Sequence, residues 1–203
     1  MSRKPASERI LETADRLFYG QGTVIGVDTI AAEAGISKRT LYNHYPSKDT
    51  LIVAYLQRRL REIPTTDAPP AQQILDDFDR LERAFGWDGF RGCAFVNAVA
   101  ELKDPRHAAN AIALQFKERR RQWFRALLEL GGAPDPEGLS LQLLLLVDGA
   151  IAAALVRKDP TVARAAKEAA RVLLQAAGLV AHAPTAPSAP KPADPPASRP
   201  PLG

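Results

Sequence analysis

A dense set of hydrogen-bond donors and aromatic edges lies in the short segment 38–44. Its members are Lys38, Arg39, Thr40, Tyr42, Asn43 and His44. Leu41 is the one aliphatic residue of the segment, so a helix over residues 38–44 would bury Leu41 and expose the other side chains. Such a face suits the major groove of DNA, where side chains reach base edges and phosphates. The segment therefore indicates a helix that contacts DNA.

A second short helix is predicted just before that segment, over residues 29–34. Asp28 is its expected side-chain cap, and Ile30, Ala31 and Ala34 form its inner face. Gly35 is expected to end it, because a chain that reverses within a few residues needs a positive φ, which glycine adopts without steric cost.

The second helix of the pair is expected over residues 38–45, with Ser37 as its cap and Leu41 as its anchor. The spacing of Ala31, Gly35 and Leu41 is that of a helix-turn-helix. Pro46 ends the second helix. Ser47 caps the next one, where exposed amides and the Lys48 ammonium could hold a phosphate.

The run TIAAEAGISKRTLYNHYPSKDTL resembles the DNA-binding region of the TetR family of bacterial transcriptional regulators. The resemblance covers about residues 7–55 and rests on Thr29, Ala31, Gly35, Leu41, Tyr42, Tyr45, Lys48 and Leu51. Tyr45 stands where the family more often has Phe. The resemblance implies phosphate contacts from Thr29, Tyr42, His44 and Lys48. It implies that Lys38, Arg39, Thr40 and Asn43 approach bases, and Ser37 and Tyr45 complete the predicted DNA-binding set.

An amphipathic helix over residues 7–19, ended by a Gly-Gln-Gly turn, completes a three-helix head. Arg3 and Lys4 precede it. They either reach a phosphate or the minor groove, or belong to a solvated arm. We predict an N-terminal DNA-binding domain over residues 1–47.

The rest of the chain predicts an all-α fold of about nine helices. Further helices are expected over residues 48–62, 71–85, 93–102, 104–130, 139–156 and 160–177. The acidic run of Asp76, Asp77 and Asp79 is expected to face solvent, and Leu130 is expected on the apolar inner face of its helix. Residues 48–180 are predicted to form an effector-binding and dimerisation domain. Residues 181–203 hold 8 of the 17 prolines and are expected to be a disordered tail.

An effector pocket is predicted around polar and aromatic residues of the second domain, namely Cys93, Asn97, Glu101, Phe116, Arg120 and Trp123. The segment GCAFVNAVAELKDPRH resembles a TetR subgroup in which a Gly-Cys pair opens the sixth helix. Two interpretations of Cys93 stay open. It is either a small buried side chain, or a reactive thiol favoured by the helix N-terminus and by Arg91.

The two C-terminal helices are so apolar that each needs a partner on more than one side. The TetR resemblance implies that they form a four-helix interface with a second copy of the chain. The residues predicted there are Leu146, Gly149, Ala150, Ala153, Ala169 and Leu173. A two-fold dimer would set two recognition helices about one DNA turn, ~34 Å, apart on a palindrome.

The composition and the apolar runs indicate which kind of protein the chain is. The net charge is +4, and residues 1–62 carry 10 Lys and Arg against 7 Asp and Glu. A single cysteine argues against a disulfide framework, the N-terminus lacks a signal-peptide pattern, and the apolar run 139–156 falls short of the ~20 residues that span a bilayer. We expect a cytoplasmic homodimer that binds double-stranded DNA and a small effector, with no metal, cofactor or membrane partner. The leading interpretation is a ligand-responsive repressor. The alternatives are a thiol-based redox or electrophile sensor using Cys93 and, more remotely, an all-α enzyme.

Overall fold

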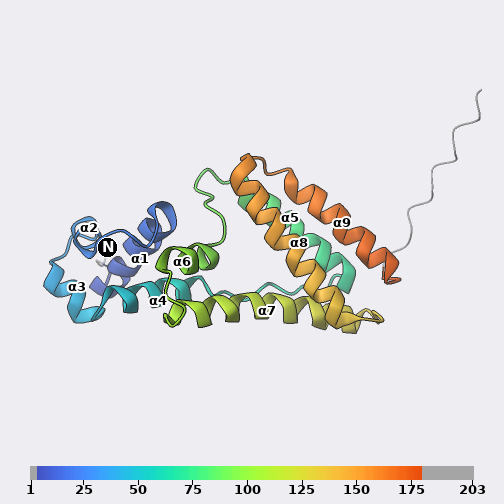
Figure 1. The fold of residues 1–203 in the computed structure, drawn as a ribbon, viewed down its shortest axis with the longest axis horizontal. Coiled ribbons are helices and arrows are strands. Elements are labelled where there is room, and N and C mark those ends of the chain that lie inside the picture. Colours follow the sequence, from blue (N-terminus) through green and yellow to red (C-terminus); the bar gives the residue numbers. More distant parts are fainter. Residues whose placement is uncertain (1–3, 180–203) are drawn as a thin grey trace, which may run out of the picture.

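The computed structural model describes residues 4–179, and all the regular elements in that range are α-helices (Figure 1). These nine helices are α1 (Ala6–Gln21), α2 (Val27–Glu33), α3 (Lys38–His44), α4 (Lys48–Arg59), α5 (Pro70–Phe85), α6 (Ala94–Leu102), α7 (Ala108–Leu130), α8 (Pro136–Arg157) and α9 (Val162–Ala176). The all-α prediction is confirmed. The predictions for Arg3 and for the tail 181–203 lie outside the described residues.

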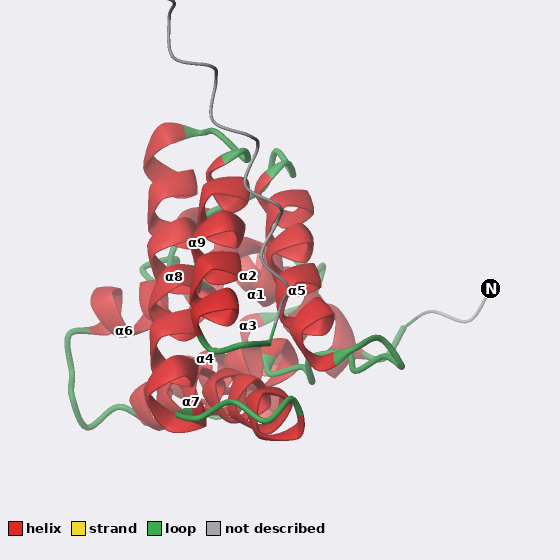
Figure 2. Ribbon diagram, turned by 90° about the vertical axis from the view of Figure 1, so that its right-hand side faces the viewer, coloured by secondary structure: helices red, strands yellow, loops and turns green. Residues whose placement is uncertain are grey.

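The helices form two groups joined by α4, α6 and α7. Figure 1 shows α1, α2 and α3 at one end, and α5, α8 and α9 at the other. Helix α7 runs along one side between the two ends. Figure 2 views the second group from its end and shows α5, α8 and α9 side by side. We call α1 to α3 the head.

Two hydrophobic clusters correspond to these groups. The first combines the inner faces of α1 to α4 with α6 and the start of α7, and the second combines α5, α8 and α9 with the end of α7. Helix α7 contributes Ala109 and Ile112 to the first and Phe124 and Leu128 to the second. The head is thus packed onto the same long helix that supports the rest of the molecule.

Several predicted helix ends are confirmed and others are wrong. Gly35 has φ of 63°, and Ser37 and Ser47 cap α3 and α4 through their side chains. Asp28 is not the cap of α2. The helix begins at Val27, behind Gly26, and the Asp28 carboxylate instead pairs with Lys38.

Helices α4 and α7 are shorter than predicted. Helix α4 ends at Arg59, because Leu60 takes ψ of 73° and leaves the helical conformation. Helix α7 begins at Ala108, because the Asp104 carboxylate closes a turn by accepting from the Arg106 amide at 2.9 Å. The His107 ring nitrogen then caps the helix by accepting from the Ala109 amide at 3.0 Å.

Two predicted orientations are wrong. Asp77 was expected in solvent, but only 2% of it is exposed, since it lies beneath two arginines. Leu130 was expected inside, but 75% of it is exposed, because the second cluster is closed before α7 ends.

Helix α8 is longer than predicted. Its 22 residues make it long and apolar enough to cross a membrane, so the expectation that it falls short was wrong. A core helix of a protein without a membrane meets the same criterion. Helix α8 packs on α5, α7 and α9, and near its middle the Asp148 carboxylate pairs with Lys117 of α7.

Candidate DNA-binding face and effector cavities

The α2–turn–α3 unit is held by a small apolar core and by one arginine. Ile30 and Leu41 are fully buried, and Ala31 is nearly so, which lets the two helices cross closely. The Arg9 guanidinium of α1 donates to the backbone oxygens of Ala34 and, at 2.8 Å, Gly35. Arg9 therefore fixes the turn. No local sequence signal pointed to it, since its target lies 25 residues away.

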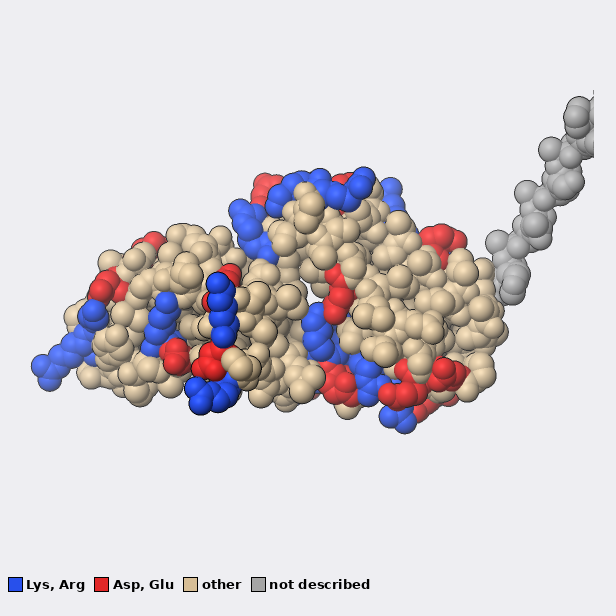
Figure 3. Space-filling view, in the orientation of Figure 1, with Lys and Arg blue, Asp and Glu red and all other residues tan. Residues whose placement is uncertain are grey.

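The predicted recognition surface lies on the exposed side of α3. Arg39, Tyr42, Asn43 and His44 are exposed, and Thr40 is half-buried beside the Ser37 cap. Leu41 is buried while these side chains face solvent, as the pattern predicted. In Figure 3 the Lys and Arg side chains on the visible face of the molecule alternate with Asp and Glu, so no single basic patch covers that face.

Two members of the predicted DNA-binding set, Lys38 and Tyr45, have partners outside α3 and its cap. Lys38 lies 2.9 Å from the Asp28 carboxylate, and that hydrogen bond raises the pKa of the Lys38 ammonium. Tyr45 is half-buried and its hydroxyl donates to the Ser7 carbonyl at 3.4 Å. Burial raises the pKa of the Tyr45 phenol. Tyr45 therefore ties the end of α3 to α1.

The start of α4 lies directly after α3. Ser47 and Thr50 form a reciprocal capping box there. Lys48 is half-buried and has no carboxylate partner within residues 4–179, while Thr29 is exposed in the first turn of α2. Free amides and an unpaired ammonium at a helix N-terminus favour an anion such as a phosphate.

The head and the turn after α1 are joined to α6 and its preceding loop by four hydrogen bonds. The Glu101 carboxylate accepts from the Thr23 amide at 2.5 Å and from the Thr23 hydroxyl at 2.8 Å. The Tyr19 hydroxyl donates to the Gly92 carbonyl at 3.1 Å. It also accepts from the Arg91 amide at 3.0 Å. Glu101, predicted in the effector pocket, thus contacts the head instead.

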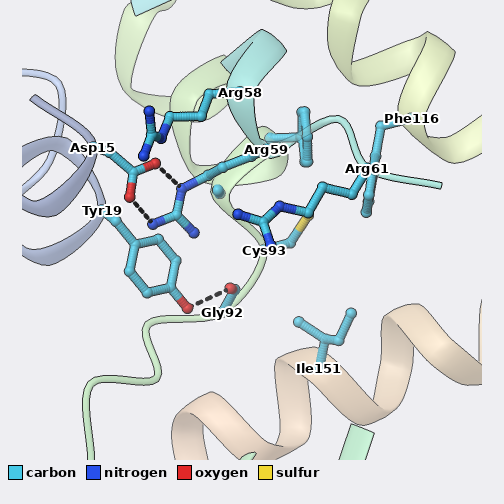
Figure 4. Close-up of a pocket in the computed structure, with 11 residues that line it drawn as sticks. Asp15, Tyr19, Arg58, Arg59, Arg61, Gly92, Cys93, Phe116 and Ile151 are labelled. Atoms are coloured by element: carbon cyan, nitrogen blue, oxygen red, sulfur yellow. Dashed lines mark hydrogen bonds and ion pairs between the residues drawn. The ribbon is translucent and has the colours of Figure 1, made fainter. Parts of the chain in front are cut away.

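A first cavity of about 440 Å³ lies between the head and the second group of helices (Figure 4). Its polar wall holds Asp15 in a two-bond pair with Arg59, at 2.7 and 2.9 Å, and the Arg59 guanidinium stacks 4.2 Å from the Tyr19 ring centre. The remaining lining residues are Arg58, Arg61, Gly92, Cys93, Ala94, Phe95, Phe116 and Ile151.

A second cavity of about 430 Å³ shares Arg61 and Phe116 with the first. Its other lining residues are Glu62, Ile63, Thr65, Arg119, Arg120 and Trp123. The structure therefore brings Phe116, Arg120 and Trp123 together as predicted, with Cys93 in the adjoining cavity. Asn97 lines neither cavity, and its side-chain amide donates to the Arg91 carbonyl at 2.7 Å.

Sequence reasoning missed the arginines at the end of α4 and the residues of α1 that line the first cavity. They looked like parts of the head and of a connecting helix. Only the packing of α1 and α4 against α6 and α7 places them beside the aromatic residues of the second domain.

A buried ion cluster lies next to the second cavity. Asp77 of α5 pairs with Arg120 at 2.9 Å and with Arg80 at 3.2 Å. Two N–H groups there, Arg120 Nε and Trp123 Nε1, are buried without a hydrogen-bond acceptor. Each such donor carries a desolvation penalty of roughly 1–3 kcal/mol.

A third hollow, about 600 Å³, opens between α8 and α9. Five of the six predicted dimer residues line it, namely Leu146, Gly149, Ala150, Ala153 and Ala169. Leu173 instead packs against the second cluster. Leu145, which also lines the hollow, leaves 61% of its surface exposed. Among the described residues no group of His, Cys, Asp and Glu is placed to hold a metal ion.

The helical fold and the α2–turn–α3 unit define a helix-turn-helix transcriptional regulator. Residues 10–55 match the family model described as bacterial regulatory proteins, tetR family. A solved TetR-type regulator from Streptomyces avermitilis is 37% identical with a TM-score of 0.79, over 86% of this chain and 99% of that one. A TetR-family regulator from Streptomyces coelicolor is 33% identical with a TM-score of 0.76, over 85% and 95%. The chain belongs to the TetR family of DNA-binding transcriptional regulators.

A shorter similarity links the chain to an uncharacterised helix-turn-helix-type transcriptional regulator of Mycobacterium tuberculosis, 34% identical over 77 residues. That match spans 37% of this chain and 38% of the relative. The Mycobacterium tuberculosis relative and the two Streptomyces proteins are transcriptional regulators, which accords with the expectation that the chain is not an enzyme.

Proposed function

We propose that this protein is a cytoplasmic repressor that binds a palindromic operator as a homodimer and leaves it when a small effector occupies the second domain. Residues 1–47 are the DNA-binding domain in this proposal, and residues 48–180 bind the effector and dimerise. The observation that carries it is the contrast between two exposed faces. The face of α3 is polar, whereas the α8–α9 face is apolar and uncovered in the single chain.

The apolar surface of the α8–α9 face supports the proposed dimer. Small side chains such as Gly149 and Ala153 allow close helix approach, and Leu145 and Leu146 flank them. Burying this surface against an identical copy removes it from water and generates a two-fold axis. Two copies of α3 can then occupy successive major grooves on one side of a palindrome.

The DNA contacts follow from position on the head. Arg39 and Asn43 are exposed on α3 and suit base edges, as does Thr40, while Tyr42 and His44 suit phosphates. Lys38 contacts a base only if it leaves Asp28. Thr29 and Lys48 suit phosphates on either side of the groove, with Ser37 and Tyr45 holding the ends of α3 in place.

Fluorescence anisotropy with the DNA upstream of the protein's own gene tests the proposal. We expect tight, salt-dependent binding by wild type and weak binding to an unrelated duplex of equal length. Equal affinity for both duplexes would contradict a specific operator.

A thiol sensor is the second candidate, favoured by the position of Cys93. Cys93 is half-buried and directly precedes the first residue of α6. It lines the first cavity together with Arg61. A small electrophile or peroxide reaching that cavity would meet it. Binding that is lost on treatment of wild type, and kept by treated Cys93→Ser, would establish this mode. Equal binding in both states would favour a non-covalent effector.

A further inference from the structure

The two cavities that meet at Arg61 and Phe116 have an unbalanced charge. Five arginines line them, against the carboxylates of Asp15 and Glu62. These five are Arg58, Arg59, Arg61, Arg119 and Arg120. Arg59 is paired with Asp15 and Arg120 with Asp77. Within residues 4–179, Arg61 and Arg119 are the lining arginines that form no ion pair.

The same walls carry buried donors without acceptors. Trp123 Nε1 and Arg120 Nε both belong to residues that line the second cavity, and neither has a hydrogen-bond partner. Native structures leave few such groups, because an unpaired buried donor destabilises the fold. Both atoms are buried, so an oxygen-bearing ligand in the cavity would meet them only if these side chains turned towards it.

The rest of the lining is aromatic. Phe116 lies where the cavities join and stacks on Phe95 at a ring-centre distance of 4.0 Å, and Trp123 lines the far end. Each cavity lies within the roughly 300–1,000 Å³ range that accommodates a small organic ligand. Aromatic walls together with unpaired guanidinium groups match a molecule with a flat apolar body and an anionic group.

We infer that the effector is an aromatic organic anion, with its carboxylate, sulfonate or phosphate held by Arg61 and Arg119 and its ring system against Phe116 and Trp123. This inference rests on the proposed effector-released regulator and names the chemical class to which the regulator responds. It assigns the anion site to the loop after α4 and to α7.

The position of Arg61 connects this site to the head. Arg61 follows the last residue of α4 by two positions, and its amide donates to the Arg59 carbonyl at 2.9 Å. Arg59 in turn holds Asp15 of α1. An anion that bridges Arg61 and Arg119 would link the end of α4 to α7. Such a ligand shifts the population of two head positions only if its affinity differs between them.

Anilinonaphthalene sulfonate is a suitable probe, because it joins a flat aromatic body to one anionic group and its fluorescence reports binding. Uncharged N-phenylnaphthylamine is the matched neutral probe. Both are titrated into the full chain as wild type, Arg61→Gln, Arg119→Gln and Arg119→Lys. Arg106→Gln is the control, since it removes the same charge from a side chain that is 93% exposed outside the cavities.

We expect each Arg→Gln variant of the site to weaken sulfonate binding about fivefold to tenfold. Arg119→Lys and Arg106→Gln should bind close to wild type, and the neutral probe should bind all five proteins equally. Arg61 and Arg119 are exposed and unpaired, so circular dichroism should show unchanged folding. The anion site would be overturned if both Arg→Gln variants bound the sulfonate as tightly as wild type. It would also be overturned if their affinity for the neutral probe fell as much as their affinity for the sulfonate.

A second measurement separates this inference from the proposed function. The sulfonate should weaken operator binding by wild type and leave the Arg61→Gln, Arg119→Gln double variant largely unaffected. Arginine-dependent probe binding with unchanged operator affinity would overturn the effector assignment. Failure of wild type to bind any specific duplex without probe would instead contradict the proposed operator, while the probe titrations still decide whether the anion site exists.

Discussion

The two ends of this molecule expose opposite kinds of surface. The head buries Leu41 and turns the polar side chains of α3 outward, whereas α8 and α9 leave Leu145 and Val172 in water beside a row of alanines. A polar face is stable in water until it meets DNA, but an extended apolar face favours a permanent partner. In the proposed function, reversible DNA recognition and stable dimerisation therefore lie at separate ends of the molecule.

Ala153→Arg should have the largest effect, because it places a charge in the apolar α8–α9 face. An unpaired buried charge costs roughly 3–5 kcal/mol, and two-fold symmetry would introduce the charge twice. We expect sedimentation to show a monomer, with operator binding lost as a consequence. Leu130→Arg is the control, since Leu130 is exposed and lies outside the α8–α9 hollow. An Ala153→Arg protein that still sediments as a dimer would show that the α8–α9 face is not the dimer interface.

Leu41→Ala tests whether the polar end depends on a single anchor. Leu41 is the buried residue of α3, so its truncation should lower the free energy of unfolding by about 2–5 kcal/mol. Urea denaturation at fixed protein concentration measures this, because dimerisation makes stability concentration-dependent. Val24→Ala, at a side chain that is 75% exposed, should change little. A loss as small as that control would show that α3 is anchored elsewhere.

Arg39→Ala should leave the fold and the dimer intact while weakening operator binding by about 1–3 kcal/mol, as expected for loss of a base contact. Anisotropy against the operator and an unrelated duplex would show a smaller loss on the unrelated duplex. Arg83→Ala is the control, since it removes the same charge from an exposed side chain of α5 in the second group of helices. An unchanged operator affinity would remove α3 from the proposed interface.

Lys48→Gln should act on the phosphate contribution alone. Loss of one phosphate contact lowers the slope of log affinity against log salt by about one and weakens both duplexes alike. Anisotropy over a series of salt concentrations gives the slope directly. A change confined to the operator would identify Lys48 as a base contact.

Glu101→Gln should have the smallest effect, about 0.5–1 kcal/mol in unfolding free energy, because the amide oxygen still accepts from Thr23 but without charge. Urea denaturation measures it against Glu129→Gln, which removes a charge from an exposed pair on α7. The effect should be accompanied by looser coupling between the head and α6. Equal stability of both variants would show that the Glu101 contact is not a support of the head.

Most of the head was predictable from sequence, because its signals are local. Ser37 caps α3 by accepting from the Thr40 amide, three residues along the chain, and Gly35 forms the turn with its own positive φ. The exception is Asp28, expected as a cap and found paired with Lys38 across the turn. Whether the predicted residues contact DNA as proposed remains a prediction.

The cavities were only partly predictable. Phe116, Arg120 and Trp123 were placed together because one helix carries them at adjacent turns. Arg61 and Asp15 were missed because they come from different elements, and Glu101 was assigned to the pocket because helical spacing set it beside Asn97 and Cys93. Spacing along one helix says nothing of what faces that helix.

The sequence alone determined the helical segments, most of their inner faces and the helix-turn-helix, since hydrophobic periodicity, capping and turn chemistry act over a few neighbouring residues. Only the tertiary structure decided that Asp77 is buried under Arg80 and Arg120, and that Arg61 joins Arg119 beside Phe116. Those relations depend on how α4, α5 and α7 pack. Side chains distant in sequence meet only when burial of the two hydrophobic clusters fixes the positions of the helices.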